Sequence, residues 1–223
     1  MDAARVLLAW RGDAYGGWQL QPDVPTVQGA VEHAVSRIMD VERVVVRAAG
    51  RLDAGVHAEA QVVAFDVPAR RTPQALLRGL NGLLPPDIAC LALSPTDASF
   101  DPRRRNAGKT YRYRLLNRPV KCPFRAGVSW HVRRRLDIDA MQAAAHALVG
   151  LHDFTSFRAS GCTAAHPNRS TKPDSAPMSR LATRARKCFR PVTRHHDDFR
   201  PGELRQRRAG PERDDIVPVE GLQ

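Results

Sequence analysis

The stretch VERVVVRAAGRLDAGVHAEAQVVAFDV, residues 41–67, decides the fold, because two apolar runs flank a loop of mostly small and polar residues. Each run, VERVVVRA (41–48) and QVVAFDV (61–67), is rich in the β-branched residues that favour strands. The intervening segment carries three chemically active side chains: Arg51, Asp53 and His57. We therefore expect a loop between two strands that displays these groups.

The spacing R-x-D-x-G-x-H suits a reactive carboxylate. Gly55 allows the backbone to turn with positive φ, and Ala54 adds no bulk over the acid, so Asp53 can project into a cleft. Arg51 is close enough in sequence to pair with Asp53 and keep it ionised, as an oxygen nucleophile requires. His57 can donate to a phosphate or simply fix the loop. Taken alone, the same motif equally suits a tight β-turn with a surface ion pair of little energetic value.

The segments around this loop predict a β-α-β-β-α-β order for the N-terminal part. AARVLLAW (3–10) and DIACLAL (87–93) read as strands, and Thr72-Pro73 begins a helix over TPQALLRGLNGLL. Thr26 is the predicted N-cap of an earlier helix with apolar residues at a helical period. Those residues are Val27, Ala30, Val31, Ala34, Val35 and Ile38.

A second copy of this plan begins near residue 103 but is not completed. KTYRYRLL (109–116) and VSWHV (128–132) predict strands, and Asp137–Val149 predicts a helix closed by Gly150 at C′. From about residue 170 prolines, arginines and acids alternate without a structural period. We expect an α+β fold of two ferredoxin-like split β-α-β units, with a mostly antiparallel sheet, a central basic cleft and an incomplete second unit. The expected parts are 1–102, 103–169 and a disordered basic tail, 170–223.

The charge of the chain indicates a polyanionic partner. Its 223 residues contain 35 Lys and Arg against 23 Asp and Glu, a formal net charge of +12. Such an excess favours nucleic-acid binding. Two arginine runs, Arg103 to Arg105 and Arg133 to Arg135, are candidates for phosphate contacts. Each run alone is also typical of an ordinary solvated surface.

The cysteines and the apolar segments argue against several other classes of protein. Four widely spaced cysteines without a C-x-x-C pair speak against a zinc finger or a disulfide scaffold and favour reduced thiols. The apolar run at residues 6–10 is too short for a signal peptide or a membrane span. We expect a cytoplasmic protein with no metal, no cofactor and no membrane partner.

The string GRLDAGVHAEAQVVAF resembles the signature G-R-T-D-x-G-V-H-A-x-x-Q-V of the tRNA pseudouridine synthase A family. Four further stretches agree with that family in order and spacing, over about residues 4 to 169. They are YGGWQLQ with TVQGAVEHA, LLRGLNGLLPPDIAC, KTYRYRLLNR and LVGLHDFTSFRASGC.

The resemblance implies an isomerase that converts uridine to pseudouridine at positions 38–40 of the tRNA anticodon arm. It implies a homodimer, tRNA as partner, and no cofactor. Asp53 matches the family's nucleophile, and Arg51 the arginine that pairs with it and helps to open the RNA stem. Tyr111 matches the tyrosine that stacks on the everted base, although a strand tyrosine at this position also suits a core-filling role. His57, Arg103, Arg104 and Arg105 are the expected further contacts to the RNA.

Two departures from the family pattern leave alternatives open. Leu52 stands where the family has threonine, and is either buried harmlessly or disturbs the carboxylate. After about residue 169 the family's F-x-H-H-M-V-R-N segment has no counterpart, which suggests a reading-frame change in the gene or damage to the sequence. A catalytically inactive RNA-binding remnant of the family is the second candidate, and a basic structural protein of the ribosome the third.

Overall fold

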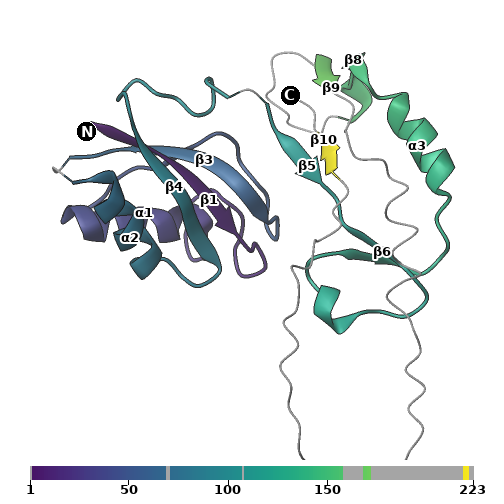
Figure 1. Ribbon diagram of the computed structural model, residues 1–223, viewed down its shortest axis with the longest axis horizontal. Helices are drawn as coiled ribbons and strands as arrows, with labels where there is room; N and C mark the ends of the chain where they lie inside the picture. Colours follow the sequence, from purple (N-terminus) through teal and green to yellow (C-terminus); the bar gives the residue numbers. More distant parts are fainter. Residues whose placement is uncertain (1, 69–70, 107, 158–167, 172–217, 221–223) are drawn as a thin grey trace, which may run out of the picture. The chain divides into compact units, whose positions relative to one another are not determined.

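The structure, a computed structural model, describes residues 2–68, 71–106, 108–157, 168–171 and 218–220 (Figure 1). The chain divides into two compact units, Met1–Ala107 and Gly108–Gln223, each of which is described by itself. The fold is mixed α/β with mostly antiparallel strand pairing, as the sequence predicts at this level. The expected division at residues 102 and 169 stays a prediction. Most of the tail expected to be disordered lies outside the described residues.

The first unit is a four-stranded antiparallel sheet in the order β2-β3-β1-β4, with two helices against one face (Figure 1). The chain order is β-α-β-β-α-β, as predicted. Its elements are β1 (Ala3–Trp10), α1 (Val27–Met39), β2 (Arg47–Ala48), β3 (Ala58–Asp66), α2 (Pro73–Leu83) and β4 (Ile88–Thr96). β1, one of the two inner strands, runs antiparallel to both of its neighbours and therefore exchanges main-chain hydrogen bonds on both sides.

The core of this unit lies between the sheet and the two helices. The largest fully buried side chains come from all layers: Leu8 in β1, Val35 in α1, Phe65 in β3, Leu76 and Leu80 in α2. Each contributes about 1.5–3 kcal/mol by leaving water. The apolar face predicted for α1 is the face that packs, since Val27, Val31, Ala34 and Val35 are all buried. The well-packed sheet therefore holds the ends of the loops that connect its strands.

Both helices of the first unit begin where the sequence predicts. The Thr26 hydroxyl accepts a hydrogen bond from the main-chain nitrogen of Gly29 at 3.2 Å, and the Thr72 hydroxyl accepts one from Ala75 at 3.2 Å. Pro73 occupies the first turn of α2, where its missing N–H costs nothing. Two short-range signals, a capping hydroxyl and an early proline, were sufficient for these boundaries.

The strand predicted over residues 41–48 is mostly wrong, because only Arg47–Ala48 pairs with a neighbour. The preceding main-chain donors bind side chains of α1 in place of a strand. The Val44 nitrogen donates to Ser36 Oγ at 2.8 Å, and the Val46 nitrogen donates to Glu32 Oε1 at 3.0 Å. Val44 and Val46 are buried, so the apolar pattern indicated burial correctly but not the hydrogen-bond partner.

The second unit consists of short strands and one longer helix. Its elements are β5 (Thr110–Arg112), β6 (Leu115–Asn117), β7 (Trp130–Val132), α3 (Ile138–His146), β8 (Gly150–Asp153), β9 (Asn168–Thr171) and β10 (Pro218–Glu220), with 3₁₀ turns η1 (Pro123–Arg125) and η2 (Thr155–Phe157). β5 pairs antiparallel with β10, β8 antiparallel with β9, and β6 parallel with β7.

Two predictions in this unit need correction. The run at 109–116 is not one strand but two, β5 and β6, with residues 113 and 114 between them. The helix predicted to reach Val149 begins after its N-cap, Asp137, as expected but ends at His146. Gly150, expected as the residue after the helix, has a φ of +110° but begins β8. A glycine with positive φ therefore indicated a change of chain direction, not the helix end itself.

Candidate active site

The loop that carries Asp53 joins β2 to β3 in the first unit, as the sequence predicts. Its side chains Arg51 and Asp53 are exposed. The Val56 nitrogen donates to the Asp53 carbonyl at 3.2 Å and closes a turn. Gly55 has a φ of +78° with open space around its Cα, so its backbone angle, not crowding, requires glycine. The turn presents the carboxylate of Asp53 to solvent.

A glycine-rich segment between β1 and α1 holds the N-terminal side of this loop. The main-chain nitrogen of Trp18 donates to the Leu52 carbonyl at 2.9 Å. Next to it, Gly17 has a φ of +104°, and a Cβ there would lie 2.7 Å from the same carbonyl oxygen. Both the backbone angle and the close approach to the Leu52 carbonyl require glycine at residue 17.

A second set of contacts holds the C-terminal side of the loop. The indole Nε1 of Trp10, the last residue of β1, donates to the Val56 carbonyl at 3.1 Å. The main-chain nitrogen of Gly12 donates to Nδ1 of His57 at 2.9 Å. A Cβ on Gly12 would stand 2.4 Å from the Val56 oxygen, so the two chain segments lie in direct contact. His57 is half-buried at this junction.

Tyr15 connects the loop to the segment between α2 and β4. Its carbonyl accepts a hydrogen bond from the Gly55 nitrogen at 3.4 Å, and its hydroxyl donates to Asp87 Oδ1 at 2.7 Å. Burial, followed by the hydrogen bond to the carboxylate of Asp87, raises the pKa of Tyr15 from 10.0 to about 12. The hydroxyl therefore stays neutral over the physiological pH range and keeps its hydrogen bond to Asp87.

Leu52, where the family pattern has threonine, is half-buried and packs against the hydrophobic core of the first unit. Its main chain still accepts the hydrogen bond from Trp18. The leucine therefore replaces a hydroxyl with an apolar contact and leaves the path of the backbone supported.

The ion pair expected between Arg51 and Asp53 is not formed among the described side chains. Arg51 instead lines a small hollow of about 160 Å³ together with Arg103. The other lining residues are Trp18, Gln19, Gln28, Ala48 and Gly50. Two guanidinium-bearing side chains, distant in sequence, are thus brought to one hollow beside the loop of Asp53.

The three arginines of the run 103–105 are all exposed but differ in their contacts. Asp101 Oδ1 accepts from the main-chain nitrogen of Arg103 at 2.8 Å, which turns the chain. Asp101 Oδ2 lies 3.6 Å from Nε of Arg104, an ion pair. Arg103 lines the hollow with Arg51, whereas Arg104 is engaged by a carboxylate.

Tyr111 lies in β5 of the second unit and is 36% exposed. The residue is therefore partly exposed, and its two alternative roles, stacking on a base and filling a core, both stay predictions.

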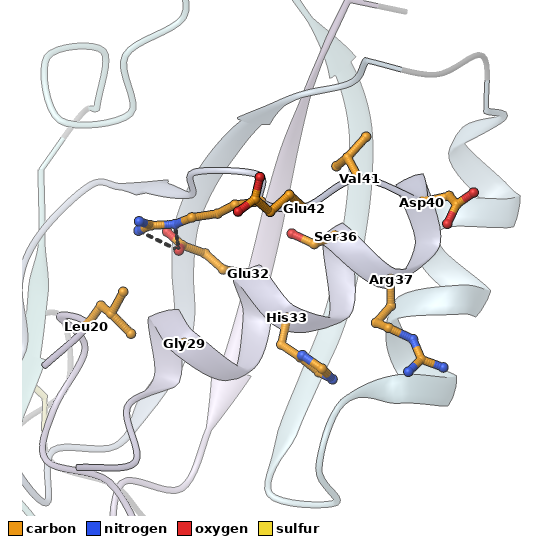
Figure 2. A pocket seen from close by; sticks show the side chains of 10 residues that line it. Leu20, Gly29, Glu32, His33, Ser36, Arg37, Asp40, Val41 and Glu42 are labelled. Atoms are coloured by element: carbon orange, nitrogen blue, oxygen red, sulfur yellow. Dashed lines mark hydrogen bonds and ion pairs between the residues drawn. The ribbon is translucent and has the colours of Figure 1, made fainter. Parts of the chain in front are cut away.

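A larger hollow of about 780 Å³ lies along α1 and contains none of the site residues expected from the sequence (Figure 2). The buried carboxylate of Glu32 accepts hydrogen bonds there from the Arg43 side chain at 3.0 Å and from Gln28 at 2.8 Å. His33, Arg37, Asp40 and Glu42 complete a rim of both charge signs. Both carboxylate oxygens of Glu32 are hydrogen-bonded to the protein, and the rim carries charges of both signs. This hollow therefore serves the packing of α1 against the segment before β2.

The described residues contain no group of three His, Cys, Asp or Glu side chains with the arrangement of a metal site. Within the same residues, no helix has the length and apolar character needed to cross a membrane.

Sequence reasoning missed the residues that support the loop from the glycine-rich segment. These are Trp10, Gly12, Tyr15, Gly17 and Trp18, with Asp87 behind Tyr15. For Gly12, Tyr15, Gly17 and Trp18 the available signal was the cluster of glycines and aromatics in GDAYGGWQ, residues 12–19. Their partners lie far away in sequence, so no local pattern could match donors to acceptors.

The sequence is similar to those of known tRNA pseudouridine synthases. A family profile described as tRNA pseudouridine synthase matches residues 10–103, which include the loop, its support and Arg103. The chain is 45% identical over 169 residues to tRNA pseudouridine synthase A of Myxococcus xanthus, covering 76% of this chain and 63% of that protein. It is 44% identical over 164 residues to the protein of the same name from Pelobacter propionicus, covering 74% of this chain and 67% of that protein.

The chain belongs to the tRNA pseudouridine synthase family. A third member, from Methylibium petroleiphilum, is 48% identical over 160 residues, 72% of this chain and 61% of that protein. The chain thus spans about three fifths to two thirds of the length of these curated tRNA pseudouridine synthases. The family profile ends before Tyr111, so the match that covers the Asp53 loop is carried by the first unit.

Proposed function

We propose that this chain isomerises uridine to pseudouridine at positions 38–40 of the tRNA anticodon stem-loop, with Asp53 as nucleophile. The observation that carries the proposal is an exposed carboxylate on a turn that is held on both sides by the segment between β1 and α1. A catalytic group must be held in place by its surroundings, and this loop meets that requirement.

The reaction needs little apparatus beyond such a carboxylate. The bond between N1 of uracil and C1′ of ribose breaks, and C5 of the same uracil bonds to C1′. The proton on C5 is released to solvent and N1 takes up a proton, so the product is an isomer of the substrate. No electrons are gained or lost overall. Asp53 serves as the nucleophile at the ribose, and the uridine must leave the stem before the carboxylate reaches its sugar.

Arginines near the loop suit the phosphates of the RNA. Arg51 and Arg103 line one hollow next to Asp53, where a phosphate would meet two guanidinium groups. Arg51 is also the group assigned to opening the stem. Arg104 and Arg105 add positive charge outside the hollow, and Tyr111 is assigned to stacking on the everted base.

The finer architecture belongs to the same proposal. The strand order β2-β3-β1-β4 supports a ferredoxin-like split β-α-β unit in the first half, and the second half is proposed as an incomplete copy. A basic cleft is part of the same proposed architecture. A cytoplasmic homodimer that binds one tRNA completes the proposal, which follows the family resemblance.

The second candidate function is an RNA-binding remnant without catalysis. One observation favours it: no ion pair joins Arg51 to Asp53 among the described residues. A reading-frame change in the gene, or sequence damage, beyond about residue 169 belongs to the same candidate. Translation of the gene in the other two frames tests this, because one frame must then encode an F-x-H-H-M-V-R-like segment.

The decisive experiment measures tritium release from tRNA labelled at C5 of uridine. We expect release with the native chain and no release with Asp53→Asn, while tRNA binding by the variant persists. Asp66→Asn is the matched control, because Asp66 sits at the opposite end of β3 and pairs with Arg47 at 2.9 Å. Release by the control must match the native chain.

Other outcomes separate the candidates. Binding of tRNA without release by the native chain supports the inactive remnant. Binding that is indifferent to Asp53 and tracks only the arginines, again without release, supports a basic structural protein. Equal release by Asp53→Asn and by the native chain would overturn the assignment of the nucleophile.

A further inference from the structure

The hydrogen bond between Gly12 and His57 defines the state of the imidazole. A main-chain N–H can only donate, and it points at Nδ1 of His57 at 2.9 Å. Nδ1 must therefore present its lone pair, and a neutral ring then carries its proton on Nε2. The contact uses His57 as an acceptor at Nδ1, in keeping with the loop-fixing role, one of the two roles that the sequence left open for this residue.

The segment at residues 10–12 and the loop at residues 56–57 are packed so closely around this bond that one cannot move without the other. Gly12 is buried, and a Cβ on it would lie 2.4 Å from the Val56 carbonyl oxygen. The same carbonyl accepts the indole N–H of Trp10 at 3.1 Å. Two adjacent residues of the loop are thus bound at the end of β1 or just after it: Val56 to Trp10, and His57 to Gly12.

This junction lies on the C-terminal side of the turn that carries Asp53. On the other side, Trp18 holds the carbonyl of Leu52 at 2.9 Å. Between the two anchors stands Gly55, whose flexible backbone is held by one long hydrogen bond of 3.4 Å to Tyr15. If the contact of His57 is lost, the C-terminal side of the turn is held more weakly, by the indole of Trp10 and the long bond to Tyr15, and the carboxylate gains freedom.

We propose that His57 is a positioning residue that holds the Asp53 loop in its working geometry through Nδ1, without contacting the RNA. The inference rests on the proposed function of Asp53. Of the two roles that the sequence left open for His57, it selects the fixing of the loop over the contact with a phosphate.

Two substitutions of similar size distinguish the roles. The side-chain oxygen of asparagine sits on Cγ, as Nδ1 does, so His57→Asn can still accept from Gly12. The polar atoms of glutamine sit one bond further out, near the place of Nε2, so His57→Gln loses this acceptor. We expect kcat for tritium release to stay within about threefold of native in His57→Asn and to fall up to about 100-fold in His57→Gln. KM for tRNA should be unchanged in both.

The opposite pattern would overturn the proposal. If His57 contacts RNA through Nε2, His57→Gln keeps activity, His57→Asn loses it, and KM rises with the loss. His33→Asn, on the exposed face of α1, is the control for removal of a histidine, and it should behave as native in every measurement.

A measurement independent of catalysis completes the test. Hydrogen exchange at the Gly12 amide should be slow in the native chain and in His57→Asn, and at least tenfold faster in His57→Gln. The nitrogen-15 NMR signal of Nδ1 should be that of an unprotonated imidazole nitrogen. Unchanged exchange in His57→Gln would refute the anchor. If the native chain releases no tritium, the proposed function fails, and the exchange data still decide whether His57 anchors the loop.

Discussion

The buried carboxylate of Glu32, on α1, accepts a hydrogen bond from the main-chain nitrogen of Val46 at 3.0 Å. The same carboxylate pairs with Arg43 at 2.9 Å and accepts from the side-chain amide of Gln28 at 2.8 Å. A carboxylate is costly to bury unless its oxygens are hydrogen-bonded, and here they are. The helix thereby holds the segment that leads into β2 and, through it, the start of the loop with Arg51 and Asp53.

Replacing Glu32 with alanine should destabilise the first unit. The Val46 N–H would be left buried without its acceptor, and Arg43 would lose its partner, for a cost of about 2–3 kcal/mol. Urea unfolding followed by tryptophan fluorescence measures the change, since Trp10 and Trp18 lie in this unit. Glu42→Ala, an exposed neighbour on the same segment, should change stability by less than about 0.5 kcal/mol. Equal effects of the two variants would contradict the role of Glu32.

Gly17→Ala should destabilise the protein and impair the Asp53 loop. The backbone angle of +104° strains any residue with a Cβ, and that Cβ would lie 2.7 Å from the Leu52 carbonyl. We expect a loss of about 1–3 kcal/mol. The matched control is Gly82→Ala in α2, where an added Cβ meets nothing within 4 Å. Because alanine favours a helix, the control should gain about 0.5–1 kcal/mol, and thermal unfolding of both variants checks the opposite signs.

Alkaline pH should weaken the support of the loop through Tyr15. Burial and the bond to Asp87 raise its pKa from 10.0 to about 12 in the folded chain. A raised pKa means that the stabilising contribution is complete below pH 10 and is lost as pH rises toward 12. Stability measured across this range should therefore fall more steeply in the native chain than in Tyr15→Phe. Identical pH profiles would show that Tyr15 does not contribute.

Arg103 and Arg104 should differ in their contribution to tRNA binding. Arg103 lines the hollow with Arg51, whereas Arg104 is paired with Asp101. Removal of one phosphate contact lowers the slope of log affinity against log salt by about 1. We expect that change for Arg103→Ala, a smaller one for Arg104→Ala, and little for Arg78→Ala on the outer side of α2. Binding titrations at several salt concentrations provide the slopes, and a larger effect of Arg104→Ala would refute the distinction.

Local patterns were sufficient for most elements of the first unit. A short, mostly apolar run located β1 over Ala3–Trp10, and a helical period with a capping threonine located α1. The strand expected over 41–48 was mostly wrong for a reason that no local pattern contains. Its donors bind Glu32 and Ser36, side chains on a helix that the pattern of the segment itself does not reveal.

By itself the sequence determined which groups the site loop would carry and that a glycine would turn it, since Arg51, Asp53 and Gly55 are neighbours along the chain. Only the tertiary structure decided what holds that loop. The contacts from Gly12 to His57 and from Trp18 to Leu52 join residues brought together by strand pairing, as does the approach of Arg103 to Arg51. The physical reason is that secondary-structure preference acts over a few residues, whereas a donor finds a distant acceptor only after the sheet has formed.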